Sequence, residues 1–290
     1  MKTLRRRLLV AATVLFALGL GIALGSGPLN RPADVLPGSS ADTGARDQSL
    51  GAFESGFVDG TAGKALGGKL KGRHVVLITL TGADSDQVAA IRGALKDADA
   101  TIVSEPKFAA KLTDPANRQF VDSVARQAAL KVREVEKGPA SYQRIGSALA
   151  RALLGDAGEK PDESGQAIWE AFVEGDLVTG DKPKELGDSV VMVAGRQRNG
   201  SASKVIAELA RAIGSHGEGM VLAGPSRSSL TNGAIAALRE GPGDDVMSTV
   251  DVTDSVAGPV VVALALGRDA AGKPGAWGTP RSADGPVPGE

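Results

Sequence analysis

Apolar and polar positions in the central part of the chain predict a strand, a helix and a second strand in close succession. Residues 74–80 (HVVLITL) form a short run of mostly β-branched side chains, which is typical of a strand buried on both faces. Residues 85–98 then carry apolar side chains at spacings of three and four, and Asp84 is placed to cap this helix. Residues 100–106 predict the next strand. The three segments form a βαβ unit, whose two strands run parallel.

The same alternation resumes toward the C-terminus after a helical insertion at residues 107–175. Further strands are predicted at residues 188–195, 219–225, 247–252 and 258–267, of which the last is the longest. Further helices are predicted at residues 115–133, 140–154, 164–174, 201–213 and 229–240. The pattern therefore predicts an α/β fold over residues 71–267, with a doubly wound, mainly parallel sheet.

A different pattern occupies the N-terminus, where three arginines at residues 5–7 precede an apolar run at residues 8–24. At 1.5 Å of rise per residue this run extends over about 26 Å, close to the roughly 30 Å of a bilayer core. Residues 1–27 thus predict one transmembrane helix, with the arginines in the cytoplasm and the C-terminal domain extracytoplasmic. The alternative is a cleaved signal peptide, because Ala23-Leu24-Gly25 has the small-x-small form of a cleavage site.

Two segments lack the pattern of a packed domain. Residues 28–70 begin with a stretch rich in Pro, Gly, Ser and Asp and continue with glycine-interrupted apolar positions, which predicts a flexible linker with a weak helix. Residues 268–290 are rich in Gly and Pro and predict a flexible tail. In this tail, Trp277 has two interpretations: it docks a partner, or it closes the edge of the sheet.

Composition narrows the functional class. The chain has 33 basic and 34 acidic residues, a balance that does not point to a nucleic-acid partner. It has no cysteine, which excludes thiol chemistry and disulfides. No GxGxxG follows the first strand and no GxxxxGK[ST] occurs, while the sequence GPSRS at residues 224–228 lacks the last glycine of a nucleophile elbow. We therefore expect a protein that is not an enzyme.

The remaining candidate chemistry lies at the ends of strands. Doubly wound sheets bind ligands beyond the carboxyl ends of their strands, where the strand order reverses. The candidates at these positions are Thr81, Asp84, Arg196, Ser226 and Arg227. Metal donors are scarce: His74 and Met220 are weak candidates, since the former begins a strand and the latter lies in an apolar run, where methionine usually fills a core.

Several segments together resemble a known family. They are FALGLGIALGSG (16–27), KGRHVVLITLTGADSDQVAAIRGAL (71–95), VMVAG (191–195), VLAGPS (221–226) and MSTVDVTDSVAGPVVVALALGRDAAGKPGAWGT (247–279). The chain is similar in these parts to the MctB-like copper-transporter family of actinobacteria, which includes the mycobacterial copper transport outer-membrane protein. The resemblance implies a channel-forming protein of the outer membrane or cell envelope, concerned with copper export and homeostasis, with copper as a possible ligand.

Two functional hypotheses follow. The first, based on the resemblance, is copper transport in the cell envelope. The second is a binding or scaffold module for envelope assembly or cell separation, which works through a membrane or protein partner and binds no metal.

Overall fold

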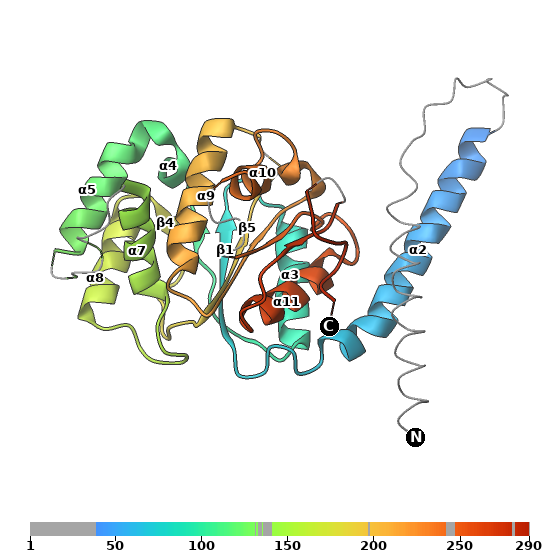
Figure 1. Cartoon of the computed structure of the whole chain (residues 1–290), viewed down its shortest axis with the longest axis horizontal. Helices are drawn as coiled ribbons and strands as arrows, with labels where there is room; N and C mark the ends of the chain where they lie inside the picture. Colours follow the sequence, from blue (N-terminus) through green and yellow to red (C-terminus); the bar gives the residue numbers. More distant parts are fainter. Residues whose placement is uncertain are drawn as a thin grey trace. The chain divides into compact units, whose positions relative to one another are not determined.

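The computed structural model of the chain describes residues 39–130, 132, 135, 141–196, 198–241, 247–279 and 282–289. The chain divides into two units, Met1–Thr61 and Ala62–Glu290, and the second unit contains the α/β fold (Figure 1). No helix among the described residues is long and apolar enough to cross a membrane. The transmembrane helix predicted at residues 1–27 lies outside the described residues.

Helix α2 (Ser39–Leu66) occupies much of the segment for which the sequence predicts a linker with a weak helix. Phe53 and Phe57 lie four residues apart on this helix and stack with their ring centroids 6.4 Å apart. Leu66, at the end of the helix, and Leu70 are fully buried in the second unit. Two buried leucines therefore anchor the segment through which the chain enters the α/β fold, directly before the first strand.

The described strands form one sheet in the order β4-β3-β1-β5-β6-β7-β8, with β2 also paired to β1. The strands are β1 (His74–Leu80), β2 (Thr101–Ser104), β3 (Lys107–Phe108), β4 (Val178–Thr179), β5 (Ser189–Val193), β6 (Gly219–Ala223), β7 (Ser248–Val250) and β8 (Ala276–Trp277). Only the pair β3 and β4 is antiparallel among the described strand pairs. The prediction of an α/β fold with a mainly parallel sheet is confirmed.

Helices cover both faces of the sheet because alternate residues of each central strand point in opposite directions. The helices that follow α2 are α3 (Ser85–Asp97), α4 (Ala110–Thr113), α5 (Arg118–Ala128), α7 (Ser141–Leu153), α8 (Glu163–Glu174), α9 (Gly200–Gly214), α10 (Ala234–Arg239) and α11 (Gly258–Asp269). Val76, Ile78 and Leu80 share one core with α5, α7, α8, α9 and α10. On the other face α11 packs against α3, β6 and β7.

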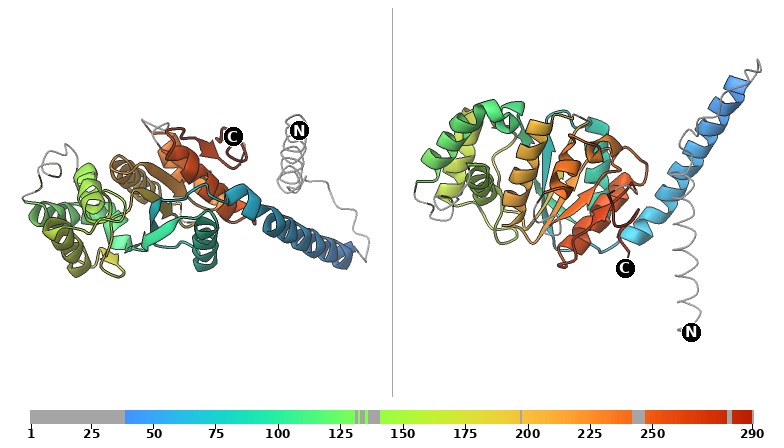
Figure 2. Two further views of the ribbon diagram at one scale, coloured as in Figure 1. Left: turned by 90° about the horizontal axis from the view of Figure 1, so that it is seen from below. Right: turned by 45° about the horizontal axis from the view of Figure 1, so that its top comes forward.

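The helical insertion lies at one end of the sheet, where α5, α7 and α8 pack together (Figure 2). Arg144 on α7 donates a hydrogen bond to Asp122 on α5, with Nε and Oδ1 2.8 Å apart. Phe172 and Trp169 of α8 belong to the same core as the sheet. The insertion is thus continuous with the main core.

One predicted strand is wrong. Residues 258–267 form most of helix α11, whereas the sequence predicts a long strand there. The run VVVALAL has many β-branched residues, but Pro259 occupies the first turn, a position that favours a helix start. Because α11 is covered by the sheet and by α3, it is apolar nearly all round and shows no helical period. The predicted helix at residues 229–240 is also shorter, beginning at Ala234 after a 3₁₀ turn at Ser226–Ser229.

The residues after Arg268, for which the sequence predicts a flexible tail, carry specific contacts. Trp277 in β8 pairs with Val250 of β7 and is 8% exposed, so it closes this edge of the sheet. The backbone N–H of Ala276 donates to Asp284 at 2.8 Å, and that of Gly278 donates to the carbonyl of Gly285 at 2.9 Å.

A fully buried carboxylate, that of Asp251, fastens this C-terminal segment to the sheet. Its Oδ1 accepts a hydrogen bond from the Thr279 N–H at 2.8 Å, and its Oδ2 accepts from the Thr279 hydroxyl at 2.6 Å and from Arg239 Nη1 at 3.3 Å. Arg239 also donates to the hydroxyls of Thr249 and Ser282. Burial lowers the pKa of Arg239, and the nearby Asp251 carboxylate opposes that shift.

A second buried carboxylate, that of Asp269, binds the amino ends of β6 and β7, at the end of the strands opposite to Asp251. It accepts hydrogen bonds from the N–H groups of Met220 at 2.8 Å and Ser248 at 2.5 Å, at the beginnings of β6 and β7. Burial raises the pKa of Asp269, and these hydrogen bonds counteract the shift. Buried carboxylates therefore hold both ends of β7. Asp269 binds the first residue of the strand, and Asp251 directly follows the last one.

Gly278 has no room for a side chain: its φ is 129°, and a Cβ would lie 1.7 Å from Asp251 Oδ1. We expect Gly278→Ala to lower the free energy of unfolding by about 2 kcal/mol or more, because the methyl group displaces the carboxylate. The matched control is Gly93→Ala on α3, where a Cβ meets nothing within 4 Å and should stabilise by about 0.5–1 kcal/mol. Urea unfolding of both variants measures the difference, and a Gly278→Ala variant as stable as the parent would contradict the prediction.

Candidate ligand-binding site at the carboxyl ends of the strands

The strand order reverses between β1 and β5. From β1 the chain passes through α3 to β2 on one side, whereas β5 pairs with the other side of β1 and leads through α9 to β6. Helices α3 and α9 begin at the carboxyl ends of these two strands and cover opposite faces of the sheet. The divergence of the two helices leaves a crevice, which is where doubly wound sheets bind ligands.

Sequence reasoning proposes five residues for this site, and two of them line one small pocket there. The pocket has a volume of about 160 Å³, and its lining includes Asp84, Gln87, Arg196 and Pro225. Asp84 caps α3, since its Oδ1 accepts hydrogen bonds from the N–H groups of Asp86 and Gln87. Arg196 is an exposed residue shortly after β5. The switch point therefore places an acidic and a basic side chain around the same pocket.

The other three predicted residues lie near this pocket without lining it. Thr81 lines a neighbouring pocket of about 450 Å³, and its hydroxyl donates to the Phe108 carbonyl at 3.0 Å. Ser226 and Arg227 lie in the 3₁₀ turn after β6, where Arg227 is exposed. Gly82, with a φ of 83°, lines both pockets.

The larger pocket contains one ion pair and a further basic residue, Lys107. Arg92 donates to Glu105 through both Nε and Nη2, and Nε lies 2.9 Å from Oε2. This hydrogen bonding raises the pKa of Arg92. By contrast, Asp84, Arg196, Arg198 and Arg227 take part in no ion pair within the described part of the chain. The small pocket is therefore lined by one acidic and one basic residue that are not engaged in ion pairs with other described residues.

Two residues that sequence reasoning missed hold the site together. The hydroxyl of Thr253 donates to Gln87 Oε1 at 2.8 Å, which links the loop after β7 to α3. Asp254 accepts hydrogen bonds from the N–H of Ser226 at 2.9 Å and from its hydroxyl at 2.8 Å. Both residues directly follow the strand predicted at residues 247–252, so the rule that selected the other strand ends would also have found them.

The weak metal candidates lie elsewhere. His74 begins β1, at the opposite end of the sheet from the pocket, and its Nδ1 lies 3.8 Å from Glu185 Oε2. Met220 is 1% exposed and packs beside Met247 beneath Gly214. Strand β5 separates the strands of His74 and Met220, which puts them about 10 Å apart or more. Within the ranges that the structure describes, no three His, Cys, Asp or Glu side chains gather into a group that could hold a metal ion.

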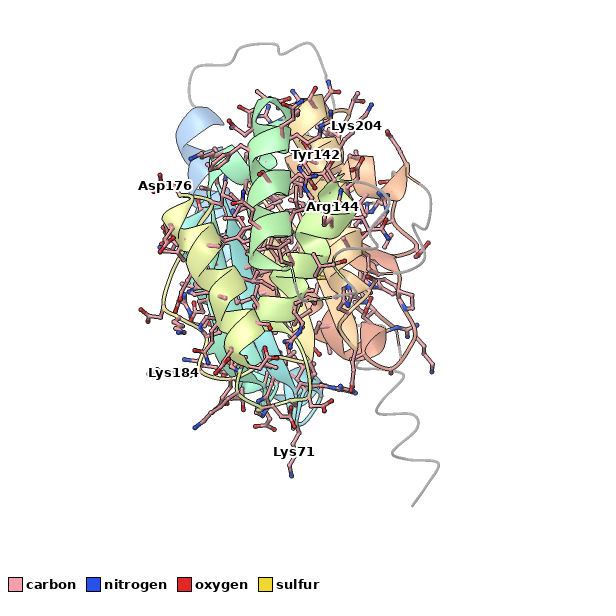
Figure 3. The ribbon with its side chains drawn as sticks, turned by 90° about the vertical axis from the view of Figure 1, so that its left-hand side faces the viewer. Lys71, Tyr142, Arg144, Asp176, Lys184 and Lys204 are labelled. Atoms are coloured by element: carbon pink, nitrogen blue, oxygen red, sulfur yellow. The ribbon has the colours of Figure 1, made fainter. Side chains whose placement is uncertain are left out.

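The carboxyl ends of the strands, where the pocket lies, are remote from the point at which the chain enters the α/β fold. Lys204, near the start of α9, lies at the end with the pocket, whereas Lys71 and Lys184 lie at the opposite end (Figure 3). Lys71 lies shortly before β1, at the point where the chain enters the α/β fold. Along the seven residues of β1 the pocket is about 23 Å from this entry.

Comparison with known proteins identifies a family. The model of the family described as "Copper transport outer membrane protein, MctB" matches residues 1–288. The chain belongs to this family. The resemblance seen in the sequence is thus confirmed, and the MctB description connects the chain with copper transport and the outer membrane. No curated protein sequence matches the chain.

The link between Thr253 and Gln87 is open to a direct test. We expect Thr253→Val and Gln87→Ala each to cost about 0.5–1.5 kcal/mol of unfolding free energy, because each removes one partner of the bond. The double variant should lose less than the sum, and the difference is the coupling energy. Thr101→Val, at an exposed position of β2, is the control and should change stability little. Additive losses in the double variant would mean that the two side chains do not interact.

Proposed function

We propose that this MctB-family chain takes part in copper transport in the cell envelope, with copper as its cargo, and that its second unit is a non-enzymatic binding module. The observation that carries the copper part is the family match over residues 1–288, which includes the whole described α/β fold. The binding part rests on the pocket at the switch point, with its unpaired Asp84 and Arg196. Copper transport is thus proposed for the chain as a whole, and ligand binding for its second unit.

The chemistry of the site supports a non-enzymatic role. Ser226 is hydrogen-bonded to Asp254, but a serine nucleophile needs a base such as histidine between the two. His74 lies at the other end of the sheet, and His216 Nε2 lies 3.1 Å from the Ser147 hydroxyl. Among the described residues the pocket is instead lined by capping, amide and guanidinium groups, which bind ligands without reacting with them.

The location that we propose is the extracytoplasmic side of an envelope membrane, with residues 1–27 as the anchor. The arginines before the apolar run favour this orientation. The chain enters the α/β fold at the amino end of β1, so the pocket lies at the end of the domain that is remote from the entry. An anchored domain of this kind would present its pocket away from the point of attachment.

A second candidate function is a scaffold of envelope assembly or cell separation that handles no metal. Thioethers are suitable ligands for Cu(I). Because those of Met192, Met220 and Met247 are buried in the main core and not displayed to an ion, the structure favours this alternative. Under this alternative the pocket would bind an envelope component or a membrane partner, and any effect on copper would be indirect.

Copper content separates the two functions. In the native host, we expect deletion of the gene to raise cellular copper during growth with added copper, and the full chain to restore it. Zinc content is the control and should not change. Unchanged copper together with altered cell shape or separation would contradict the transport proposal and support the scaffold. Mass spectrometry of washed cells measures both metals.

Copper binding by the full chain tests the weak donors. A ligand that prefers the native state raises the melting temperature. We expect any shift produced by Cu(I) under anaerobic, reducing conditions to persist in His74→Ala and Met220→Leu, because the fold keeps these residues apart. Met220→Leu preserves the volume of the core. Loss of the shift in both variants would show that the two side chains hold the ion together, contrary to this expectation.

A further inference from the structure

The small pocket at the switch point has an unusual distribution of charge. Asp84 and Arg196 line the same space but form no ion pair with each other. Both cap bonds to α3 use Asp84 Oδ1, so Oδ2 accepts no hydrogen bond from any described residue. Each charge thus has capacity for a further partner inside the pocket.

The remaining lining restricts what that partner can be. Gln87 Oε1 is engaged by the Thr253 hydroxyl, which leaves the Gln87 amide nitrogen as a donor. Pro225 and Ala194 contribute an apolar wall. The volume of about 160 Å³ is similar to that of an engineered cavity of about 150 Å³ that accepts benzene. The pocket is therefore sized for a molecule of only a few non-hydrogen atoms.

We propose that this pocket binds a small zwitterion of the α-amino acid class, with its carboxylate on Arg196 and its ammonium on Asp84. A guanidinium binds a planar carboxylate through two parallel hydrogen bonds, and a carboxylate accepts from an ammonium. A simple anion would satisfy Arg196 but would be repelled by Asp84, and a simple amine would have the opposite defect. Only a ligand with both charges matches the two sides, and the apolar wall suits a short side chain.

Neighbouring charged groups lie outside the lining of the pocket. Arg198 and Arg227 are exposed, and Asp86 is in the first turn of α3. Asp254 is occupied by Ser226 and does not compete for the ligand. The inference rests on the proposal that this site binds ligands, and it is independent of copper transport.

The test is calorimetric titration of the full chain with L-alanine and D-alanine, with acetate, ethylamine and inorganic phosphate as singly charged probes. We expect at least one alanine to bind and the three other probes to bind much more weakly. Arg196→Gln and Asp84→Asn should each weaken alanine binding about tenfold or more, because each removes one charge-assisted hydrogen bond. Asn is a good N-cap, so Asp84→Asn retains the start of α3.

Arg198→Gln and Asp86→Asn are the matched controls. Each removes a charge of the same sign as its test variant from a residue that does not line the pocket, and each should change the affinity for alanine little. Absence of alanine binding would overturn the inference, as would binding that survives Asp84→Asn. Phosphate binding that depends on Arg196 alone would also overturn it and would define a simple anion site. None of these results bears on the copper content of the deletion strain, so the failure of one proposal is distinguishable from the failure of the other.

Discussion

The buried carboxylate of Asp251 is the interaction on which the arrangement of the domain depends. A charge that is fully removed from water needs close partners, and Asp251 obtains them from α10, through Arg239, and from the C-terminal segment, through Thr279. These contacts fix the end of β7. Thr253 and Asp254 follow within three residues, and they in turn position α3 and the 3₁₀ turn after β6. The geometry of the candidate pocket is thus set from β7, a strand that contributes no residue to its lining.

The segment that carries most of the family resemblance, residues 247–279, has structural reasons for its polar residues. Ser248 and Asp269 are joined by a hydrogen bond, Thr249 accepts one from Arg239, and Asp251 binds Thr279. Each of these groups is buried or partly buried and has a partner. The polar residues of this segment therefore have structural roles in this chain that do not depend on transport.

The sequence predicted most of the fold because its local signals agree with the tertiary structure. The run at residues 74–80 became β1, and Asp84 caps α3 as expected. The failure at residues 258–267 has the opposite cause: a helix covered on both sides loses the period that distinguishes it from a strand. For the site, the strand-end rule found Asp84 and Arg196 but not Gln87, because its contact with Thr253 joins residues 166 positions apart. The same limit applies to His74 and Met220, whose separation follows from strand order and not from spacing.

The position of Thr279 has a consequence for how the protein reaches its native state. One partner of Asp251, Thr279, lies 28 residues further along the chain, beyond helix α11. During synthesis the carboxylate has only Arg239 as a partner until Thr279 has emerged, 28 residues later. A chain truncated before Thr279 would therefore lose two of the three described hydrogen bonds to this buried acid. Such a chain would unfold more readily and would be more exposed to proteolysis.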